Sequence, residues 1–451
     1  MIRIARSERG LALPMALGMM MVLAIALAAV LTLSVGGESA ARRQNADQQA
    51  LALAEAGINQ AASILVAATD PSVPSALGSG STNMEGGTSA YSATLSGLRW
   101  TVVGTGTVPN PTATGGPVQR TGSMQFDISV ANTPWEYSFA DQPAGCMTIR
   151  NDAVFATPLW INGDLCLANN ALYTASKLYV GGKVTNGGSI GTVGLPISSA
   201  TIVGGCTGGV PDPHPCTAAD SVYASSISQT PSALTKPPAD FGLWYSAAKP
   251  GPANACTSGT MPGGFDNDTT RNRSRPTFDL TPGSFYDCRY VDGAGNTVGQ
   301  ITWTPGSPGT LTVAGTIYFD GDITHSGSAV YAGRATIYAS GKVTFTNNST
   351  LCGISGCSSS WDTSNNVLML VAGSTTDTNG VLFSNNAVFQ GAVYAVNNVY
   401  IDNNAALWGP AVARSIYVDN NAAQHKALIR LTPGAPGVSL TVQPTPGTWR
   451  G

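Results

Sequence analysis

The chain has 451 residues, a net charge of −3 and only 10% charged side chains, with 53 glycines and 28 prolines. This composition excludes a disordered polyelectrolyte, and the low net charge excludes a general field that would hold nucleic acid, so we expect no nucleic-acid partner. Small residues and turn formers in place of charged ones are more typical of an extracellular, β-rich structural protein than of a cytosolic enzyme.

The amino-terminal region contains a long apolar segment, Leu11 to Val35, without a charged side chain. About 20 apolar residues suffice to cross a bilayer, and a secretory signal has a shorter apolar core, so we expect a retained transmembrane helix with the lipid bilayer as a partner. Arg3, Arg6 and Arg9 precede this segment, which favours a cytoplasmic amino terminus. The protein is therefore predicted to be a single-pass, membrane-anchored protein whose body lies outside the cytoplasm or at the cell surface.

The helix is predicted to continue beyond the membrane segment to about residue 68. No proline occurs between Pro14 and Pro71, so nothing in the sequence interrupts it. Apolar residues at steps of three and four predict one buried stripe on its second half. The residues of this stripe are Leu51, Ala54, Ile58, Ala61 and Leu65.

The residues around the start of the apolar segment carry a family resemblance. Glu8 to Met15 reads Glu-Arg-Gly-Leu-Ala-Leu-Pro-Met and resembles the class III leader of type IV prepilins. The resemblance implies a leader over residues 1–10, cleavage between Gly10 and Leu11 by a prepilin peptidase, and other pilin-like subunits as partners. A second stretch, Ala52 to Gly57, resembles the helix end of PilX-type minor pilins.

The resemblance has one departure with a consequence for function. Major pilins carry Glu at the fifth position of the mature helix, and this chain has Met15 there. The departure favours an accessory subunit over the main subunit of a fibre. The alternative interpretation of the whole segment is a plain signal anchor.

Two segments follow the helix. Residues 69–98 are rich in Ser, Gly, Thr and Pro, which predicts a flexible linker. Within residues 99–145, alternating apolar and polar side chains predict antiparallel strands at Trp100–Val103 and Met124–Val130. These strands are candidates to pack against the end of the helix, as strands do in pilin heads.

The chain contains eight cysteines, and they do not form the close Cys/His clusters of zinc sites. An even number without such clusters favours disulfide bonds in an oxidising compartment, and we expect no metal and no cofactor. Cys352 with Cys357, and Cys206 with Cys216, are the favoured local pairs, and the remaining pairing is open. The disulfide candidates are Cys146, Cys166, Cys206, Cys216, Cys256, Cys288, Cys352 and Cys357.

The body of the chain repeats short strand-like segments that end in Gly or a double Asn. Many steps between the pairs are near, or add up to, about 18 to 20 residues, which is the period of a solenoid whose coils cover their apolar faces by stacking. Asn and Gly adopt the left-handed conformation of tight corners, and stacked Asn side chains form hydrogen-bonded ladders. The double-Asn pairs begin at Asn169, Asn347, Asn365, Asn385, Asn397, Asn403 and Asn420.

The predicted fold class is therefore a long amino-terminal, pilin-like transmembrane α-helix followed by a mainly β body. The body is predicted to be a right-handed parallel β-helix, a β-solenoid, over residues 146–430, with a Cys- and Pro-rich insertion at 204–300. A β-sandwich is the alternative. Residues 431–451 are expected to form a Pro/Gly-rich tail or cap.

Parallel β-helices also carry enzymes that act on polysaccharide, so paired carboxylates are the catalytic candidates. Asp320 and Asp322 would face one side of a strand, and Asp402 and Asp419 are close to one coil apart. Carboxylates roughly 5 to 10 Å apart suit glycoside hydrolysis. Asp beside Gly at a strand end more often supports a turn, so we assign no catalytic residue. Convergence of the four carboxylates in one groove would favour the enzyme.

The insertion contains further candidates with simpler alternatives. Asp266, Asn267 and Asp268 offer oxygen ligands for calcium, but the EF-hand pattern is absent and a solvated loop is favoured. Three arginines that would suit an acidic glycan or phosphate are equally typical of a solvated edge; they are Arg271, Arg273 and Arg275. The glycosylation acceptor pattern occurs at Asn267, Asn272, Asn347 and Asn348. No phosphate-loop, dinucleotide-binding or Gly-x-Ser-x-Gly motif occurs.

These observations predict a noncatalytic, pilin-like protein of the cell envelope. It would be a minor pilus or pseudopilus component, or a pilus assembly protein, with a β-helical adhesin or scaffold domain outside the cytoplasm. An extracellular glycan or other surface ligand is the expected partner of that domain. The alternatives are a membrane-anchored β-helix enzyme that acts on polysaccharide, and a passive anchored surface protein without a pilus.

Overall fold

The computed structural model contains two compact units. The first, which we call the helix–sheet unit, comprises Met1–Ser129 and Val442–Gly451, and the second, the solenoid unit, comprises Val130–Thr441. The solenoid unit is therefore an insertion in the chain of the helix–sheet unit. The structure describes residues 12–68, 71, 76–96, 98–111, 115–131, 133–248, 277–291, 297–427, 429, 432, 434–437 and 439–451.

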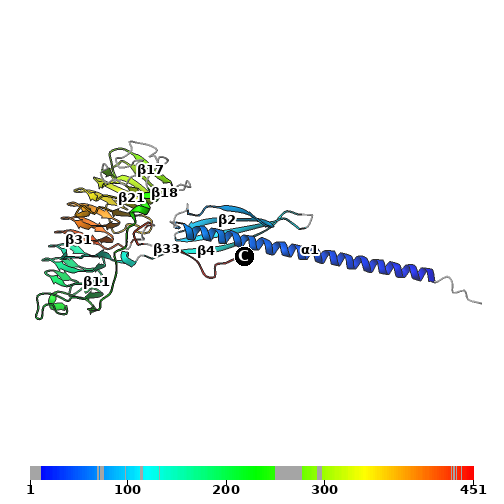
Figure 1. Cartoon of the computed structure of the whole chain (residues 1–451), viewed down its shortest axis with the longest axis horizontal. Helices are drawn as coiled ribbons and strands as arrows, with labels where there is room; N and C mark the ends of the chain where they lie inside the picture. The colour runs from blue at the N-terminus through cyan, green and yellow to red at the C-terminus, as the bar shows by residue number, and fades with distance from the viewer. Residues whose placement is uncertain are drawn as a thin grey trace, which may run out of the picture. The chain divides into compact units, whose positions relative to one another are not determined.

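Helix α1 (Ala12–Ala67) is the first element, and Figure 1 shows it as one uninterrupted helix. By length and apolar composition it is the one helix of the described residues that could cross a membrane. Its second half buries the predicted stripe, with one difference: Leu53 is buried and Leu51 is only half-buried. The buried stripe also extends toward the amino end of the helix through Ala46 and Ala50.

The helix packs on one antiparallel sheet with the strand order β1-β2-β3-β4-β33. The predicted linker at 69–98 is wrong, because residues of this segment form two of the strands. Ser, Thr and Ala alternate there with inward-facing Ser89 and Tyr91, so small residues build a strand, β2, that pairs with β3 on one side and with β1 on the other. The strands are β1 (Gly80–Met84), β2 (Gly87–Ser96), β3 (Arg99–Val108), β4 (Val118–Ala131) and β33 (Ser439–Pro444).

The carboxyl terminus also differs from the prediction of a tail. Strand β33 lies beside β4, and the chain beyond it continues to pair: Ser123 and Arg450 exchange two backbone hydrogen bonds of 2.7 and 3.0 Å. Prolines and glycines here bound a short strand at the sheet edge, a position that tolerates them. The last strand of the helix–sheet unit is thus supplied by the chain after it has left the solenoid unit.

The solenoid unit confirms the predicted parallel β-solenoid. Its coils contribute strands to two large, mainly parallel sheets, and their inward side chains form one continuous apolar core. A representative coil runs through β27 (Ala392–Ala395), β28 (Asn398–Ile401) and β29 (Ala406–Trp408), each of which pairs in parallel with the next coil.

The smaller of these sheets shows how the coils are stacked. In spatial order its strands are β12 (Val184–Asn186), β9 (Asp164–Leu167), β6 (Cys146–Ile149), β31 (Ser415–Val418), β28 (Asn398–Ile401), β25 (Asn379–Phe383), β22 (Val343–Phe345), β20 (Ile323–His325) and β16 (Phe278–Asp279). Strand β6 therefore pairs with β9 on one side and with β31, from the last coil of the chain, on the other.

The chain thus enters the solenoid in the middle of the stack, builds outward in one direction, crosses to the opposite end, and builds back until its last coil meets its first. Figure 1 shows this as colours that do not follow chain order along the stack: teal coils adjoin orange ones, green coils lie beyond the teal ones, and yellow-green strands lie at the other end. The same junction is made in the larger sheet. There β30 (Ala411–Ala413) pairs with β5 (Ser138–Ala140), and β32 (Ala423–His425) pairs with β7 (Val154–Phe155).

The larger sheet of nineteen strands contains the remaining elements. Its strands before the crossing are β5 (Ser138–Ala140), β7 (Val154–Phe155), β8 (Leu159–Ile161), β10 (Leu172–Tyr173), β11 (Lys177–Val180), β13 (Ser189–Ile190), β14 (Ser199–Ile202) and β15 (Ile227–Ser228). Those after it are β17 (Tyr286–Val291), β18 (Thr297–Thr304), β19 (Gly309–Phe319), β21 (Ser328–Ala339), β23 (Thr350–Cys352), β24 (Val367–Ala372), β26 (Val388–Gln390), β27, β29, β30 (Ala411–Ala413) and β32 (Ala423–His425).

The predicted insertion at 204–300 is in part a member of the stack. Strand β15 closes a coil against β14 at one end, and β17 and β18 form an antiparallel cap on β19 at the other. Between them, the crossover segment, residues 229–248, follows the outer face of the solenoid and ends in α2 (Phe241–Ala248).

Specific contacts fix the crossover segment to coils that are far apart in sequence. Tyr179 donates a hydrogen bond to the Ser232 carbonyl, and Lys236 Nζ donates to the carbonyls of Ala395 and Val396 at 2.7 and 2.8 Å. Phe241 of α2 packs edge-on against Tyr338, with ring centroids 5.4 Å apart. An outer row of aromatic side chains is buried in this way beneath the crossover segment.

Three disulfides join described cysteines, and both favoured local pairs, Cys352–Cys357 and Cys206–Cys216, are confirmed. The third, Cys146–Cys166, links neighbouring strands β6 and β9. Cys288 is also disulfide-bonded, and Cys256 lies outside the described residues.

Five of the seven double asparagines place their second residue in the left-handed conformation, as predicted for tight corners; the pairs that begin at Asn365 and Asn397 do not, and Asn398 instead begins β28. Asn348, Asn386, Asn404 and Asn421 all have φ between 56 and 60°, in the left-handed region. The backbone N–H of each donates to a carbonyl of the next coil, for example Asn348 to Asn385 at 2.9 Å. The side-chain ladder is present in one step, where Asn386 Nδ2 donates to Asn348 Oδ1 at 3.0 Å.

Candidate functional site

The first half of α1 is apolar, and its described side chains are exposed. Met15, Leu23 and Leu31 are 75%, 58% and 56% exposed, which is unfavourable in water and favourable in a bilayer or against other apolar helices. The predicted processing site, Gly10 and Leu11, lies outside the described residues. The cleavage therefore stays a prediction, and the exposed apolar half is the structural feature that bears on it.

The second half of α1 approaches the sheet so closely that backbone touches backbone. A Cβ atom added at Gly106 of β3 would lie 1.8 Å from the Ala50 carbonyl oxygen, and one at Gly104 would lie 2.1 Å from that of Ala54. The Ala52–Gly57 stretch, which carries the pilin resemblance, supplies Ala54 to this contact, and Ala50 precedes the stretch. Ser89 adds a buried hydrogen bond of 2.7 Å to the Leu53 carbonyl.

The four candidate carboxylates do not converge in one groove. Asp320 and Asp322 precede β20, whereas Asp402 follows β28, three strands further along the same sheet. At about 4.8 Å per strand this separates them by roughly 14 Å along the stack, and they lie at opposite ends of their strands as well. Asp322 instead accepts a hydrogen bond of 2.9 Å from the Lys342 backbone.

Asp402 and Asp419 are stacked in neighbouring coils, as expected from their spacing. Each accepts a hydrogen bond of 2.8 Å from the backbone N–H of the following Asn, which is turn chemistry. Burial would raise the pKa of Asp419, but hydrogen bonds from Tyr400 and the Asn420 backbone, together with Arg150, hold it below its usual value. Asp402 and Asp419 thus stabilise turns at a corner of the coil. The hypothesis of an enzyme that acts on polysaccharide depended on convergence of the four carboxylates in one groove, and this convergence is not observed.

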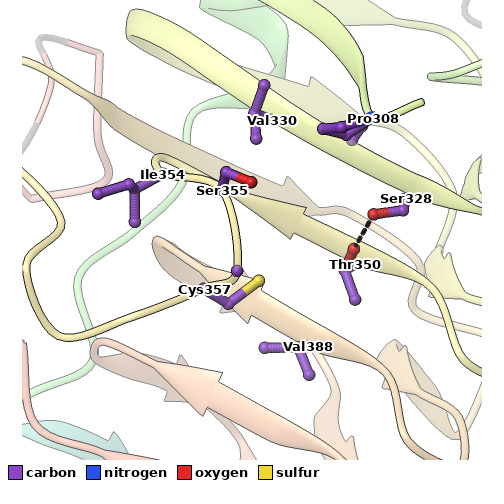
Figure 2. Close-up of a pocket in the computed structure, with 10 residues that line it drawn as sticks. Pro308, Ser328, Val330, Thr350, Ile354, Ser355, Cys357 and Val388 are labelled. Carbon is purple, nitrogen blue, oxygen red and sulfur yellow. Dashed lines mark hydrogen bonds between the residues drawn. The ribbon is translucent and has the colours of Figure 1, made fainter. Parts of the chain in front are cut away.

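A cavity of about 300 Å³, not anticipated from the sequence, lies on the outer face of the larger sheet (Figure 2). It is lined by residues of β21, β23 and β26 and by the loop that the Cys352–Cys357 disulfide closes. Ser328 and Thr350 meet in its wall through a hydrogen bond of 2.7 Å between their hydroxyls. No charged side chain is among its lining residues, which are Pro308, Ser328, Ala329, Val330, Thr350, Ile354, Ser355, Gly356, Cys357 and Val388.

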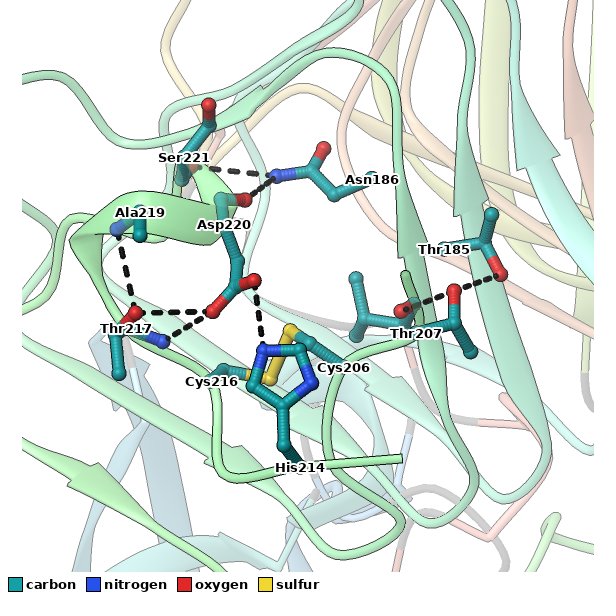
Figure 3. The surroundings of a disulfide bond; sticks show 11 residues. Thr185, Asn186, Cys206, Thr207, His214, Cys216, Thr217, Ala219, Asp220 and Ser221 are labelled. Atoms are coloured by element: carbon teal, nitrogen blue, oxygen red, sulfur yellow. Dashed lines mark hydrogen bonds and ion pairs between the residues drawn. A yellow bond between two sulfur atoms is a disulfide. The ribbon is translucent and has the colours of Figure 1, made fainter. Parts of the chain in front are cut away.

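A histidine–aspartate pair, also missed from sequence, lies at the end of the solenoid near β15 (Figure 3). His214 Nε2 and Asp220 Oδ1 are 2.9 Å apart, beside the Cys206–Cys216 disulfide. Burial would raise the pKa of Asp220, but hydrogen bonds from Thr217 and His214 outweigh it and lower the pKa.

The surroundings of this pair are those of a loop cap. Asp220 also caps the short 3-10 helix η4 (Ala218–Asp220) by accepting from the Thr217 backbone at 2.8 Å. Nδ1 of His214 is buried and has no hydrogen-bond partner in the described structure, so no nucleophile is activated by it there. We assign the pair to the stability of this end of the stack.

The remaining candidates fall into two groups. The calcium-loop residues 266–268, the arginines at 271, 273 and 275, and the acceptors Asn267 and Asn272 lie outside the described residues. Asn347 and Asn348 are exposed at the Asn corner. Within the described part of the chain, no group of three or more His, Cys, Asp or Glu side chains is arranged to hold a metal ion.

Comparison with known proteins gives two matches. The model of a domain of unknown function, DUF7305, matches residues 264–428, which lie in the solenoid unit. The structure is similar to that of the competence-associated pilin ComZ from Thermus thermophilus, with 13% identity, a TM-score of 0.41, and coverage of 89% of this chain and 98% of that one. No curated protein matches the sequence.

Proposed function

We propose that the chain is a noncatalytic, pilin-like protein of the cell envelope, a minor component of a pilus or pseudopilus. Its helix anchors it in the membrane and joins it to other pilin-like subunits, and its solenoid unit is displayed outside the cytoplasm as an adhesin or scaffold. The observation that carries the proposal is α1 itself: one helix with a bare apolar half and a half clamped on an antiparallel sheet.

Each half of this helix supports a different part of the proposal. The exposed apolar half can lie in the bilayer before assembly and can pack against the apolar helices of other subunits in a filament. The same surface therefore serves both membrane insertion and filament assembly. The clamped half fixes the helix to its sheet through the Gly104 and Gly106 contacts, so a pull on the helix is transmitted to the folded unit. A plain signal anchor needs no such rigid attachment.

The insertion of the solenoid supports the display role. The helix–sheet unit is complete only with β33, which follows the solenoid in the chain. The solenoid unit is therefore built into the head as a module, and its removal need not disturb the helix. This arrangement suits a subunit that carries a specialised domain.

Processing at Gly10 tests the proposal most directly. In membranes of a cell that contains a prepilin peptidase, intact-mass measurement should find a mature chain that begins at Leu11. The variant Gly10→Val should retain the leader, whereas the matched variant Gly18→Ala, in the apolar half of α1 with open space around it, should be processed normally.

Assembly is tested in the same strains. The processed protein should be found in filaments sheared from the cell surface, and Gly10→Val should remain in the membrane fraction. A wild-type chain that keeps Met1, or that is cleaved yet never enters sheared filaments, would contradict the pilus role.

A further inference from the structure

The cavity beneath the Cys352–Cys357 loop has the properties of a small binding site. At about 300 Å³ it is at the lower end of the volume of ligand pockets, so it suits a ligand of about one ring. Ser328, Ser355 and Gly356 are exposed, so it opens to solvent. The solenoid core behind it is closed by Ala329, which is 3% exposed.

The wall of the cavity is held rigid. Gly356 and Cys357 have φ of 75° and 50°, two consecutive left-handed residues that turn the loop sharply. The disulfide then ties the loop back to the end of β23, only five positions away in sequence. A site that is fixed before binding loses little entropy when the ligand arrives.

The chemistry of the lining selects the ligand class. Pro308, Val330 and Val388 form apolar walls, and the absence of a charged lining residue disfavours an ionic ligand, whose charge would be left without a partner. One of the Ser328 and Thr350 hydroxyls donates its proton to the hydrogen bond between them. The other hydroxyl can still donate to a ligand, and the remaining lone pairs can accept from it, which suits a ligand that both donates and accepts. Apolar ring faces with hydroxyls at their rim are the properties of a neutral sugar.

We infer that this cavity binds one neutral pyranose unit of an extracellular glycan. The inference rests on the proposed display of the solenoid outside the cytoplasm, and it gives the display domain a ligand class. Val330 and Val388 contact the ring's C–H face, and the Ser328–Thr350 pair binds adjacent ring hydroxyls. Val388 belongs to an outward row of one residue per coil, which continues through Ala406, Ala423 and Val154.

Saturation-transfer NMR on the full chain tests this binding, in a detergent without a sugar headgroup. The probes are the methyl glycosides of glucose, galactose, mannose and N-acetylglucosamine. We expect transfer to at least one of them, with millimolar affinity, and its loss in Val388→Phe, which fills the cavity. The matched control is Val154→Phe, a half-buried valine of the same outward row, and it should bind as the wild type does.

A second variant keeps the test decisive if Val388→Phe does not fold. Replacement of both hydroxyls in Ser328→Ala/Thr350→Val should weaken binding about tenfold, the effect of losing one or two hydrogen bonds. Thr344→Val, an outward threonine of the other sheet, is its control.

Three results would overturn the inference: no transfer to any probe, equal effects of Val388→Phe and Val154→Phe, or stronger binding of cyclohexanol than of every sugar. The last would identify an apolar site in place of a sugar site. None of these results changes the processing at Gly10, so a failure here is distinguishable from a failure of the pilus role.

Discussion

Single residues at the corners decide how the coil closes. Asn348, Asn386, Asn404 and Asn421 occupy the left-handed conformation, which most L-residues reach only at a cost of about 1 to 2 kcal/mol. Their backbone N–H groups are thereby aimed at the next coil and satisfied there. This feature was predictable from sequence, because the residue type that tolerates the conformation is itself the visible signal.

A buried histidine makes the solenoid sensitive to acid. His325 is fully buried, its ring contacts Phe345 of the next coil, and Nε2 lies 3.0 Å from the Thr350 carbonyl. Burial lowers the pKa of His325 from 6.5 to about 4, against the opposing effect of the Thr350 hydrogen bond. The folded state therefore keeps the ring neutral at a pH where the unfolded chain binds a proton.

We predict that this residue's contribution to stability is complete above pH 6.5 and is lost as the pH falls toward 4. The loss in the free energy of unfolding is roughly 3 kcal/mol, from the size of the shift. Denaturant unfolding at several pH values should show that the free energy of unfolding depends less on pH in His325→Phe than in the wild type. Phe is the residue that the next coil carries at the paired position, Phe345. His425→Gln, at a half-buried ring, should keep most of the slope; parallel profiles for wild type and His325→Phe would contradict the assignment.

At the scale of elements, the contact between α1 and β3 depends on two glycines. A side chain at Gly106 would meet the backbone of Ala50, which cannot move without displacing the helix. We expect Gly106→Ala to destabilise this contact by about 2 kcal/mol or more, the usual cost of overpacking. Hydrogen exchange, followed by mass spectrometry, should show faster exchange in the helix at residues 46–65.

The matched control is Gly116→Ala, in the loop between β3 and β4, where a Cβ atom meets open space. It should leave exchange of the helix unchanged. Equal protection of residues 46–65 in the two variants would show that the helix is not held by this backbone contact.

The elements differ in how far sequence predicts them. The helix and its stripe were predictable because a period of three to four residues is a local property. Strands β1, β2 and β33 were not, because Ser, Thr, Gly and Pro are typical of linkers and yet build the strands here. Only the partner strand distinguishes the two, and the partner lies far away in the chain: β33 pairs beside β4 across the whole solenoid unit.

At the scale of the whole molecule, periodicity predicts that coils stack but not in which order. The sequence of a repeat does not show which coil lies beside it. The neighbour can be the next repeat in sequence or, as for β6 and β31, a repeat from the other end of the solenoid segment. The cavity was unpredictable for the same reason. Its lining comes from segments between Pro308 and Val388 that only stacking brings together.

The insertion leads to a prediction about separate folding. The bridge between Ser123 and Arg450 is antiparallel, so the start of β33 lies toward the end of β4. Replacement of residues 132–438 by an Asn-Gly turn should therefore give a hairpin and a folded helix–sheet unit. Circular dichroism and hydrogen exchange should show α1 protected at residues 46–65 as in the full chain.

The control for this deletion is a chain that ends at Ala131 and so lacks β33. It leaves the edge of β4 unpaired and removes Trp449, which packs over Gly122, so it should be less stable. Equal stability of the two shortened chains would show that β33 is not part of the unit's fold.

The pairing of the first coil with the last also determines when the first coil can complete its hydrogen bonds during the proposed export. In the proposed topology the amino terminus stays in the cytoplasm and the body crosses the membrane behind α1, so the coil of Ser138 would emerge long before its partner at Ala411, 273 positions later. Until then the edge of β5, β6 and β7 has no partner on that side, and an open parallel edge recruits other chains. If the body is exported as proposed, this exposure lasts as long as translocation does, and slow export would then favour misfolding even when the core itself is stable.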